Sequence, residues 1–144
     1  MIQRSPITPV PKPRMSQRDK WAQRACVLRY RAFCDQARAH RLELTPGCGV
    51  VFFLPIPKSW SKFRRFNENG APHTQKPDLS NLLKALEDAV CPEDSHLWHY
   101  AHLSKRWAPR GGIMILSGSH LQVAMPELGG DFYTLENECP AQPT

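Results

Sequence analysis

A short apolar repeat between two prolines constrains this chain more than any other part of its sequence. Over residues 79–90, one helix face collects the apolar residues Leu79, Leu82, Leu83, Leu86 and Val90. Proline is tolerated at the start of a helix but not in its interior, so Pro77 and Pro92 limit where this helix begins and ends. The pattern predicts a helix over residues 79–90, with Asp78 as its N-cap.

Further helix and strand patterns predict one α+β domain. A second helix is predicted over residues 24–41, with an apolar face made of Val27, Tyr30, Cys34 and Ala37. The run at residues 50–54 predicts a buried strand, and residues 97–103 and 113–116 predict two more, joined as a hairpin by a basic turn region. We expect a two-layer α+β fold with helices packed on a small mixed sheet, an edge strand near Ile7 and a loop over residues 58–76.

Length and composition are those of one ordinary domain. The chain has 144 residues, 41% of them hydrophobic, which can fill a core of modest extent. The longest apolar run stops at Pro55, far short of the ~20 residues of a membrane span. The first residues lack the layout of a signal peptide, and the five cysteines are never spaced as C-x-x-C. We expect a soluble, cytoplasmic protein with free thiols and no membrane partner.

The net charge of +6 conceals a strong asymmetry along the chain. Residues 1–120 hold all 19 Lys and Arg and 9 of the 13 acids, a net charge of +10, whereas residues 121–144 hold four acids and no Lys or Arg, a net charge of −4. We expect a domain over residues 1–120 and an acidic C-terminal tail over residues 121–144, whose weak structure signals are compatible with a flexible segment. The basic domain favours a polyanionic partner, with nucleic acid ahead of a membrane surface.

Cations and aromatic rings alternate within residues 58–66. Such a segment can hold phosphates and stack on bases, or its rings can anchor a loop to the core, and both interpretations stay open here. The histidines at positions 96, 99 and 102 alternate between faces of a predicted strand, so they do not predict a metal site.

Acidic residues bracket the predicted helix at residues 79–90. Asp78 precedes it, Glu93 and Asp94 follow it, and Lys84 lies between them. Capping can account for Asp78 but not for the later pair. A strand that follows the helix closely would leave Asp94 near the helix C-terminus, so bringing Asp94 to Asp78 needs a strand crossing beneath the helix or a second subunit.

The ordered set of motifs around this helix resembles the RusA family of Holliday junction resolvases. The run KPDLSNLLK followed by EDSH is similar to the family signature of a K/R-P/R-D-x-D-N-x-x-K helix and a D-D-x-Q turn, and the resemblance extends over most of residues 5–116. It implies a homodimeric, Mg²⁺-dependent endonuclease, with Mn²⁺ able to substitute. Such an enzyme resolves four-way DNA junctions by paired nicks during recombination, repair or phage DNA processing. The resemblance thus implies the cytoplasm of a bacterial or phage-infected cell.

The resemblance also implies roles for individual residues. Asp78, Lys84 and Asp94 take the catalytic positions, and Asn81 takes the position of the family's asparagine. Metal ligands would come from Asp78, Asp94, Glu93 and Ser80. From the basic charge of the domain, the sequence also predicts DNA contacts at Arg14, Arg18, Lys20, Lys58, Lys62, Arg64, Arg65, Lys76, Lys105, Arg106 and Arg110.

Two positions depart from the family signature. Ser80 stands where the second aspartate is usual, and His96 replaces the usual glutamine. A hydroxyl can still ligate Mg²⁺ or hold a bound water, so cleavage can survive with weaker metal affinity. The alternative hypothesis is a protein that binds branched DNA but has lost cleavage. A third hypothesis makes the acidic tail an autoinhibitor that mimics DNA phosphates.

Overall fold

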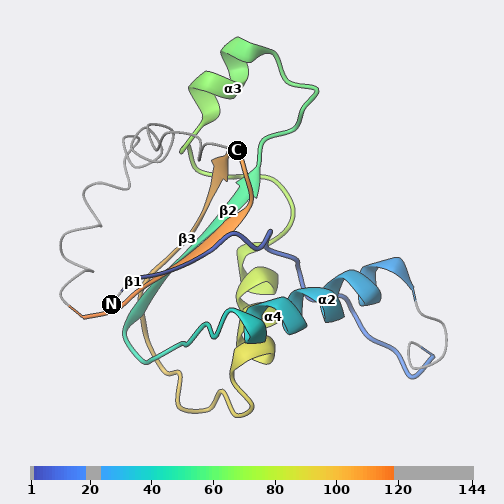
Figure 1. Cartoon of the computed structure of the whole chain (residues 1–144), viewed down its shortest axis with the longest axis vertical. Coiled ribbons are helices and arrows are strands. Elements are labelled where there is room, and N and C mark those ends of the chain that lie inside the picture. The colour runs from blue at the N-terminus through green and yellow to red at the C-terminus, as the bar shows by residue number, and fades with distance from the viewer. Residues whose placement is uncertain (1, 19–23, 119–144) are drawn as a thin grey trace, which may run out of the picture.

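The computed structural model describes residues 2–18 and 24–118 of the chain (Figure 1). In order, these residues form β1 (Ile2–Ser5), α2 (Ala25–Ala39), β2 (Cys48–Pro55), α3 (Lys62–Glu68), α4 (Leu79–Val90), β3 (Tyr100–Ala108) and β4 (Gly112–Leu116). The predicted tail over residues 121–144 lies outside the described residues. No described helix has the length and apolar character needed to cross a membrane.

The four strands form one mixed sheet in the order β1-β4-β2-β3. β2 pairs in parallel with β3 and antiparallel with β4, and β1 pairs antiparallel with β4 at one edge. The mixed sheet and an N-terminal edge strand are therefore confirmed, although β1 ends before Ile7. The predicted hairpin is wrong because β2, buried from Cys48 to Leu54, lies between β3 and β4.

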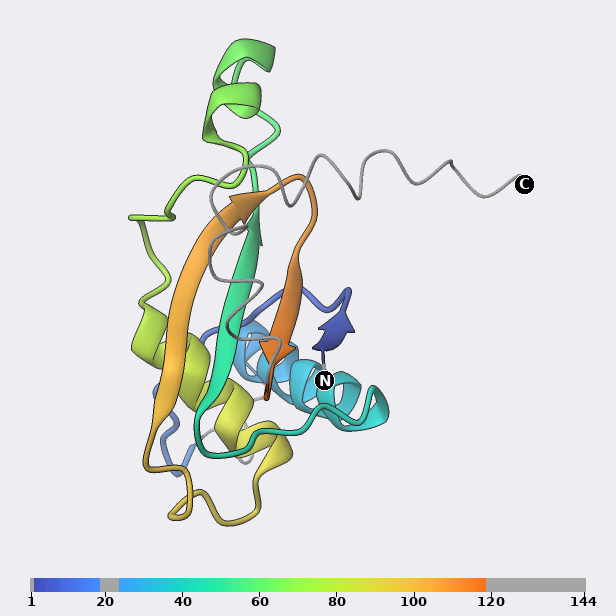
Figure 2. The ribbon, with the colours of Figure 1, turned by 90° about the vertical axis from the view of Figure 1, so that its left-hand side faces the viewer.

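α2 and α4 pack together against one face of the sheet, which gives the expected two-layer α+β fold (Figures 1 and 2). Phe33 of α2, Phe52 of β2, and Leu82 and Leu86 of α4 are at most 2% exposed and share this core. Burying one such side chain stabilises the fold by about 1.5–3 kcal/mol. Arg38 of α2 also donates from Nε to the carbonyl of Ala89 at 2.8 Å, which satisfies one of the last carbonyls of α4.

The predicted elements match the structure to different degrees. The helix over residues 79–90 is confirmed residue for residue, and the helix predicted over residues 24–41 spans 25–39. The strand predicted at residues 97–103 begins only at Tyr100 and continues to Ala108, because its parallel pairing with β2 starts opposite Cys48. The basic run after residue 103, predicted as a turn, is therefore mostly strand.

The segment over residues 58–76 is not the plain loop that was predicted. It contains α3, whose N-cap Ser61 accepts a hydrogen bond from the backbone N–H of Arg64 at 3.2 Å. No residue of this helix is buried, so its sequence has no apolar repeat from which a helix could be predicted. The four cysteines among the described residues are free and at least half-buried: Cys26, Cys34, Cys48 and Cys91.

Candidate nuclease site

The carboxylate of Asp78 lies exposed at the N-terminus of α4. Asp78 occupies the N-cap position as predicted, and its carbonyl accepts hydrogen bonds from the N–H groups of Asn81 and Leu82 at 3.1 and 3.2 Å. Its side chain, however, makes no capping hydrogen bond. Capping is therefore not the task of this carboxylate, which remains available to a ligand.

Lys105 of β3 fixes the segment that leads into Asp78. Its ammonium donates to the carbonyl of Pro77 at 2.6 Å and to the carbonyl of Gln75. Burial lowers the pKa of Lys105, while the nearby negative charge of Asp78 opposes that shift. Lys105 was predicted as a DNA contact, and in the structure two of the three donors of its ammonium are engaged by the chain. Its position beside Asp78 follows from the register of β3 and has no signal in the sequence.

An exposed polar stripe follows Asp78 along α4. Ser80 and Lys84 are one turn apart, and Asn81 lies between them on the same exposed side of the helix. Among the described residues, the side chain of Lys84 has no hydrogen-bond or ion-pair partner. Asp78 and this stripe together present a carboxylate, a hydroxyl, an amide and an ammonium to solvent.

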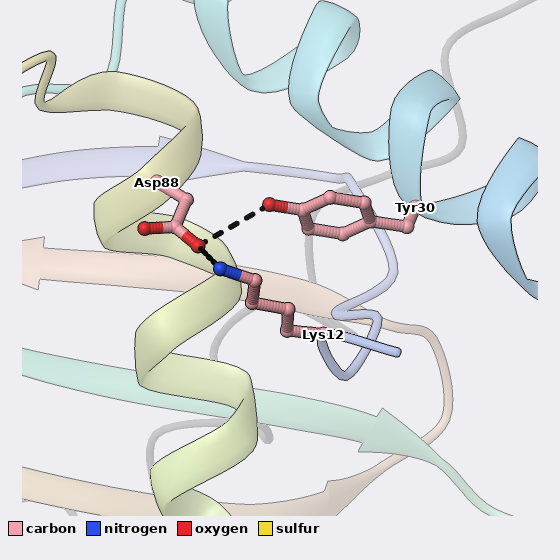
Figure 3. A network of polar contacts seen from close by, with 3 residues as sticks. All are labelled: Lys12, Tyr30 and Asp88. Atoms are coloured by element: carbon pink, nitrogen blue, oxygen red, sulfur yellow. Dashed lines mark hydrogen bonds and ion pairs between the residues drawn. The ribbon is translucent and has the colours of Figure 1, made fainter. Parts of the chain in front are cut away.

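Asp88 does not compete for Lys84, because its carboxylate binds elsewhere (Figure 3). The ammonium of Lys12 forms an ion pair with Oδ2 of Asp88, and the hydroxyl of Tyr30 donates to the same oxygen at 3.4 Å. The backbone N–H of Lys12 also donates to the carbonyl of Asn81 at 3.2 Å. The simple explanation of Lys84 as an i,i+4 partner of Asp88 is therefore wrong, and Lys84 stays free for another role.

Glu93 and Asp94 lie beyond the opposite end of α4. Both side chains are exposed. The backbone carbonyl of Glu93 lies 2.9 Å from Nδ1 of His96, and the carbonyl of Asp94 accepts a hydrogen bond from the N–H of Leu97 at 2.9 Å. The 12 residues of α4 span about 18 Å at 1.5 Å per residue. A single chain therefore does not bring the later acid pair to Asp78.

The donors at the start of α4 suit a hard cation. Mg²⁺ prefers oxygen ligands and commonly binds through one or two carboxylates together with waters and substrate phosphates. The carboxylate of Asp78, the hydroxyl of Ser80 and the amide of Asn81 are such donors. No three acidic, histidine or cysteine side chains of the described residues lie close enough to hold a metal ion together. A metal ion here would need phosphate, water or a second chain to complete its shell.

A family model for the endodeoxyribonuclease RusA matches residues 6–101, which include all of the acids and Lys84 discussed above. This chain belongs to the RusA family. The family's enzymes are crossover junction endodeoxyribonucleases, which are hydrolases that act on DNA. No curated protein and no solved structure gave a significant match.

The cations expected to contact DNA in this RusA-family chain differ in their availability. Among the described ones, exposed side chains are those of Arg14, Arg18, Lys58, Lys62, Arg64, Arg65, Lys76 and Arg110. Arg106 is half-buried and donates to the carbonyl of Gly70 at 2.9 Å, so it holds a loop in place as Lys105 does. Lys20 lies outside the described residues.

The aromatic residues near α3 in this RusA-family chain divide between anchoring and exposure. Trp60 packs edge-on against the buried Trp107 with ring centroids 4.8 Å apart, and His73 lies 4.1 Å from the same ring. Phe63 and Phe66 instead point away from the core, with exposed fractions of 75% and 82%. Trp60 therefore anchors the segment to the core, as one interpretation predicted, whereas stacking of the exposed Phe63 and Phe66 on bases stays a prediction.

Proposed function

We propose that this RusA-family chain is a divalent-metal-dependent endonuclease that resolves four-way DNA junctions by paired nicks. Mg²⁺ is the proposed cofactor, and Mn²⁺ is expected to substitute for it. The observation that carries the proposal is the exposed carboxylate of Asp78, which caps nothing and is followed along α4 by the exposed Ser80, Asn81 and Lys84.

The chemistry assigned to these residues follows from their types. When bound, Mg²⁺ neutralises charge on the scissile phosphate and lowers the pKa of the attacking water. Asp78 and Ser80 supply oxygen ligands, and the free ammonium of Lys84 stabilises negative charge on the phosphate or the leaving oxygen. The N-terminus of α4 favours an anion nearby, because its first backbone N–H groups lack helical partners.

A site that uses both Asp78 and Asp94 needs two copies of the chain. Because α4 keeps the two residues at opposite ends, the partner of Asp78 would be Asp94 of the partner subunit, with Glu93 beside it. Two α4 helices placed antiparallel about a twofold axis would form two such sites. A twofold symmetric four-way junction then meets two equivalent sites, which accounts for paired nicks.

An assay on a labelled four-way junction, with and without Mg²⁺, tests the proposal. We expect two symmetric nicks that require the metal and that disappear in Asp78→Asn. Binding of the junction should persist in that variant, because the substitution removes negative charge that repels phosphate. Cleavage by Asp78→Asn at the rate of the unmodified protein in limiting Mg²⁺ would overturn the assignment of Asp78.

Ser80 favours a second candidate function, binding of branched DNA without cleavage. Its hydroxyl replaces a carboxylate in the family signature and removes one negative charge from the proposed metal site. This candidate predicts tight, salt-sensitive junction binding and no products with Mg²⁺ or Mn²⁺. If the unmodified protein does not cleave junctions but the Ser80→Asp variant does, the second candidate function is supported.

A further inference from the structure

α3 carries two phenylalanines that take no part in the core. Phe63 and Phe66 are 75% and 82% exposed, whereas the other phenylalanines of the described residues, Phe33, Phe52 and Phe53, are buried. Figures 1 and 2 show α3 projecting beyond one end of the sheet, away from α2 and α4. Two large rings displayed together on a projecting element indicate a binding surface.

Several contacts anchor α3 to the rest of the protein. The guanidinium of Arg64 lies 3.7 Å from the ring centroid of Trp60, and Trp60 packs on Trp107 of β3. Arg65 donates from Nε to the carbonyl of Trp60 at 2.9 Å, and Ser61 caps the helix. The exposure of the two phenylalanines is thus a property of an anchored helix, so little ordering is needed when they bind.

The charge around α3 identifies the class of its partner. Residues 58–68 contain four cations, Lys58, Lys62, Arg64 and Arg65, and one acid, Glu68, a net charge of +3. Cations beside exposed rings suit a ligand that combines phosphates with flat aromatic faces, which is a nucleic acid with accessible bases. An apolar protein surface would complement the rings but not the charge.

A pocket beside Phe66 suits the same ligand. It has a volume of about 440 Å³, and its lining includes apolar groups from Pro55, Ile56, Phe66 and Pro109 together with the cations Lys58 and Arg65. A base can lie against the apolar part while its phosphate meets a cation.

We propose that α3 enters the branch point of a four-way junction, where Phe63 and Phe66 stack on bases that branching leaves accessible. The pocket beside Phe66 receives one displaced base. This inference rests on the proposed junction-resolving function and names the contact that selects branched over linear DNA. In a continuous duplex, neighbouring base pairs cover these base faces, so the rings gain nothing there.

The test uses a four-way junction with 2-aminopurine at its branch point, because the fluorescence of this base rises when it leaves its stacked neighbours. A chelator prevents cleavage during the measurement. The unmodified protein is compared with the double variant Phe63→Ala/Phe66→Ala, with Phe63→Trp/Phe66→Trp, and with Leu28→Ala, which removes a 46% exposed apolar side chain on α2. Thermal melting verifies that each variant is folded.

We expect the unmodified protein, the tryptophan variant and Leu28→Ala to raise the fluorescence. The alanine double variant should not, and its affinity for the junction should fall about tenfold or more while its affinity for linear duplex changes less than about twofold. Unchanged fluorescence and affinity in that variant would overturn the inference. The inference would also be overturned if light scattering showed that the alanine double variant no longer forms the dimer, because the two rings would then belong to a protein interface. Failure of the proposed function would give a different result from these two outcomes. The unmodified protein would then produce no Mg²⁺-dependent nicks, whether or not the fluorescence rises.

Discussion

Asp78 and Asp88 lie on the same helical segment, and the structure gives their carboxylates opposite tasks. Asp88 accepts from Lys12 and Tyr30, and the side chains of Lys12 and Asp88 are only 31% and 27% exposed. Hydrogen bonds to charged groups contribute about 1.5–3 kcal/mol, and partial solvent exposure reduces this, so Asp88→Ala should cost roughly 1–2 kcal/mol of unfolding free energy. For a chain of this length the melting temperature should fall by roughly 2–8 °C.

Asp78→Ala should change the stability of the protein little but abolish its activity. A side-chain cap typically contributes ~1 kcal/mol, but Asp78 makes no capping hydrogen bond. We expect Asp78→Ala to lower the free energy of unfolding by about 0.5 kcal/mol or less, because it removes only the interaction of the carboxylate charge with the helix dipole. Cleavage of a four-way junction should nevertheless become undetectable in Asp78→Ala, whereas Asp88→Ala should retain it at a temperature where both variants are folded.

Thermal unfolding followed by circular dichroism, together with the junction assay on the same preparations, measures both effects. If Asp78→Ala loses as much stability as Asp88→Ala and still cuts junctions, Asp78 is a structural cap and not a part of the site.

Three further predictions concern the site and its charge. Ser80→Asp should lower the Mg²⁺ concentration needed for half-maximal cleavage, because it adds a carboxylate ligand; an unchanged metal titration would place Ser80 outside the metal shell. Lys84→Ala should abolish cleavage while junction affinity in a binding titration falls less than about threefold, since one phosphate contact among many contributes little; full activity would assign Lys84 to the solvated surface. Deleting residues 121–144 should tighten junction binding at low salt if the acidic tail mimics phosphate, and identical affinity at every salt concentration would exclude that role.

Local patterns were sufficient where burial decides the structure. The helix at residues 79–90 was predicted correctly, because its leucines face the core and prolines flank it. The strand pairing was not, because the position of β2 between β3 and β4 depends on long-range contacts that no local repeat records. α3 was missed for the opposite reason, since it buries no residue and so has no apolar period.

The candidate site was predictable in its residues but not in its arrangement. The motif around Asp78 and Lys84 is visible in the sequence, and the family match includes it. The role of Lys105 was not visible, because only the path of β3 beneath the start of α4 brings its ammonium to the carbonyl of Pro77. The separation of Asp78 from Asp94 follows from the length of α4, and it turns the dimer from an expectation of the family into a requirement of the proposed site.

The proposed sharing of Asp78 and Asp94 between two chains can be measured directly with mixed dimers. Asp78→Asn and Asp94→Asn, each inactive alone, are co-expressed with different tags, and the dimers that carry both tags are purified. If the site is shared, these dimers contain one intact Asp78 and Asp94 pair and should nick one strand of the junction in Mg²⁺.

The reciprocal mixed dimer pairs the unmodified chain with Asp78→Asn/Asp94→Asn. It should be inactive, because each of its two sites then lacks one carboxylate. Nicking by this second dimer and none by the first would contradict the account and place the complete site within a single chain.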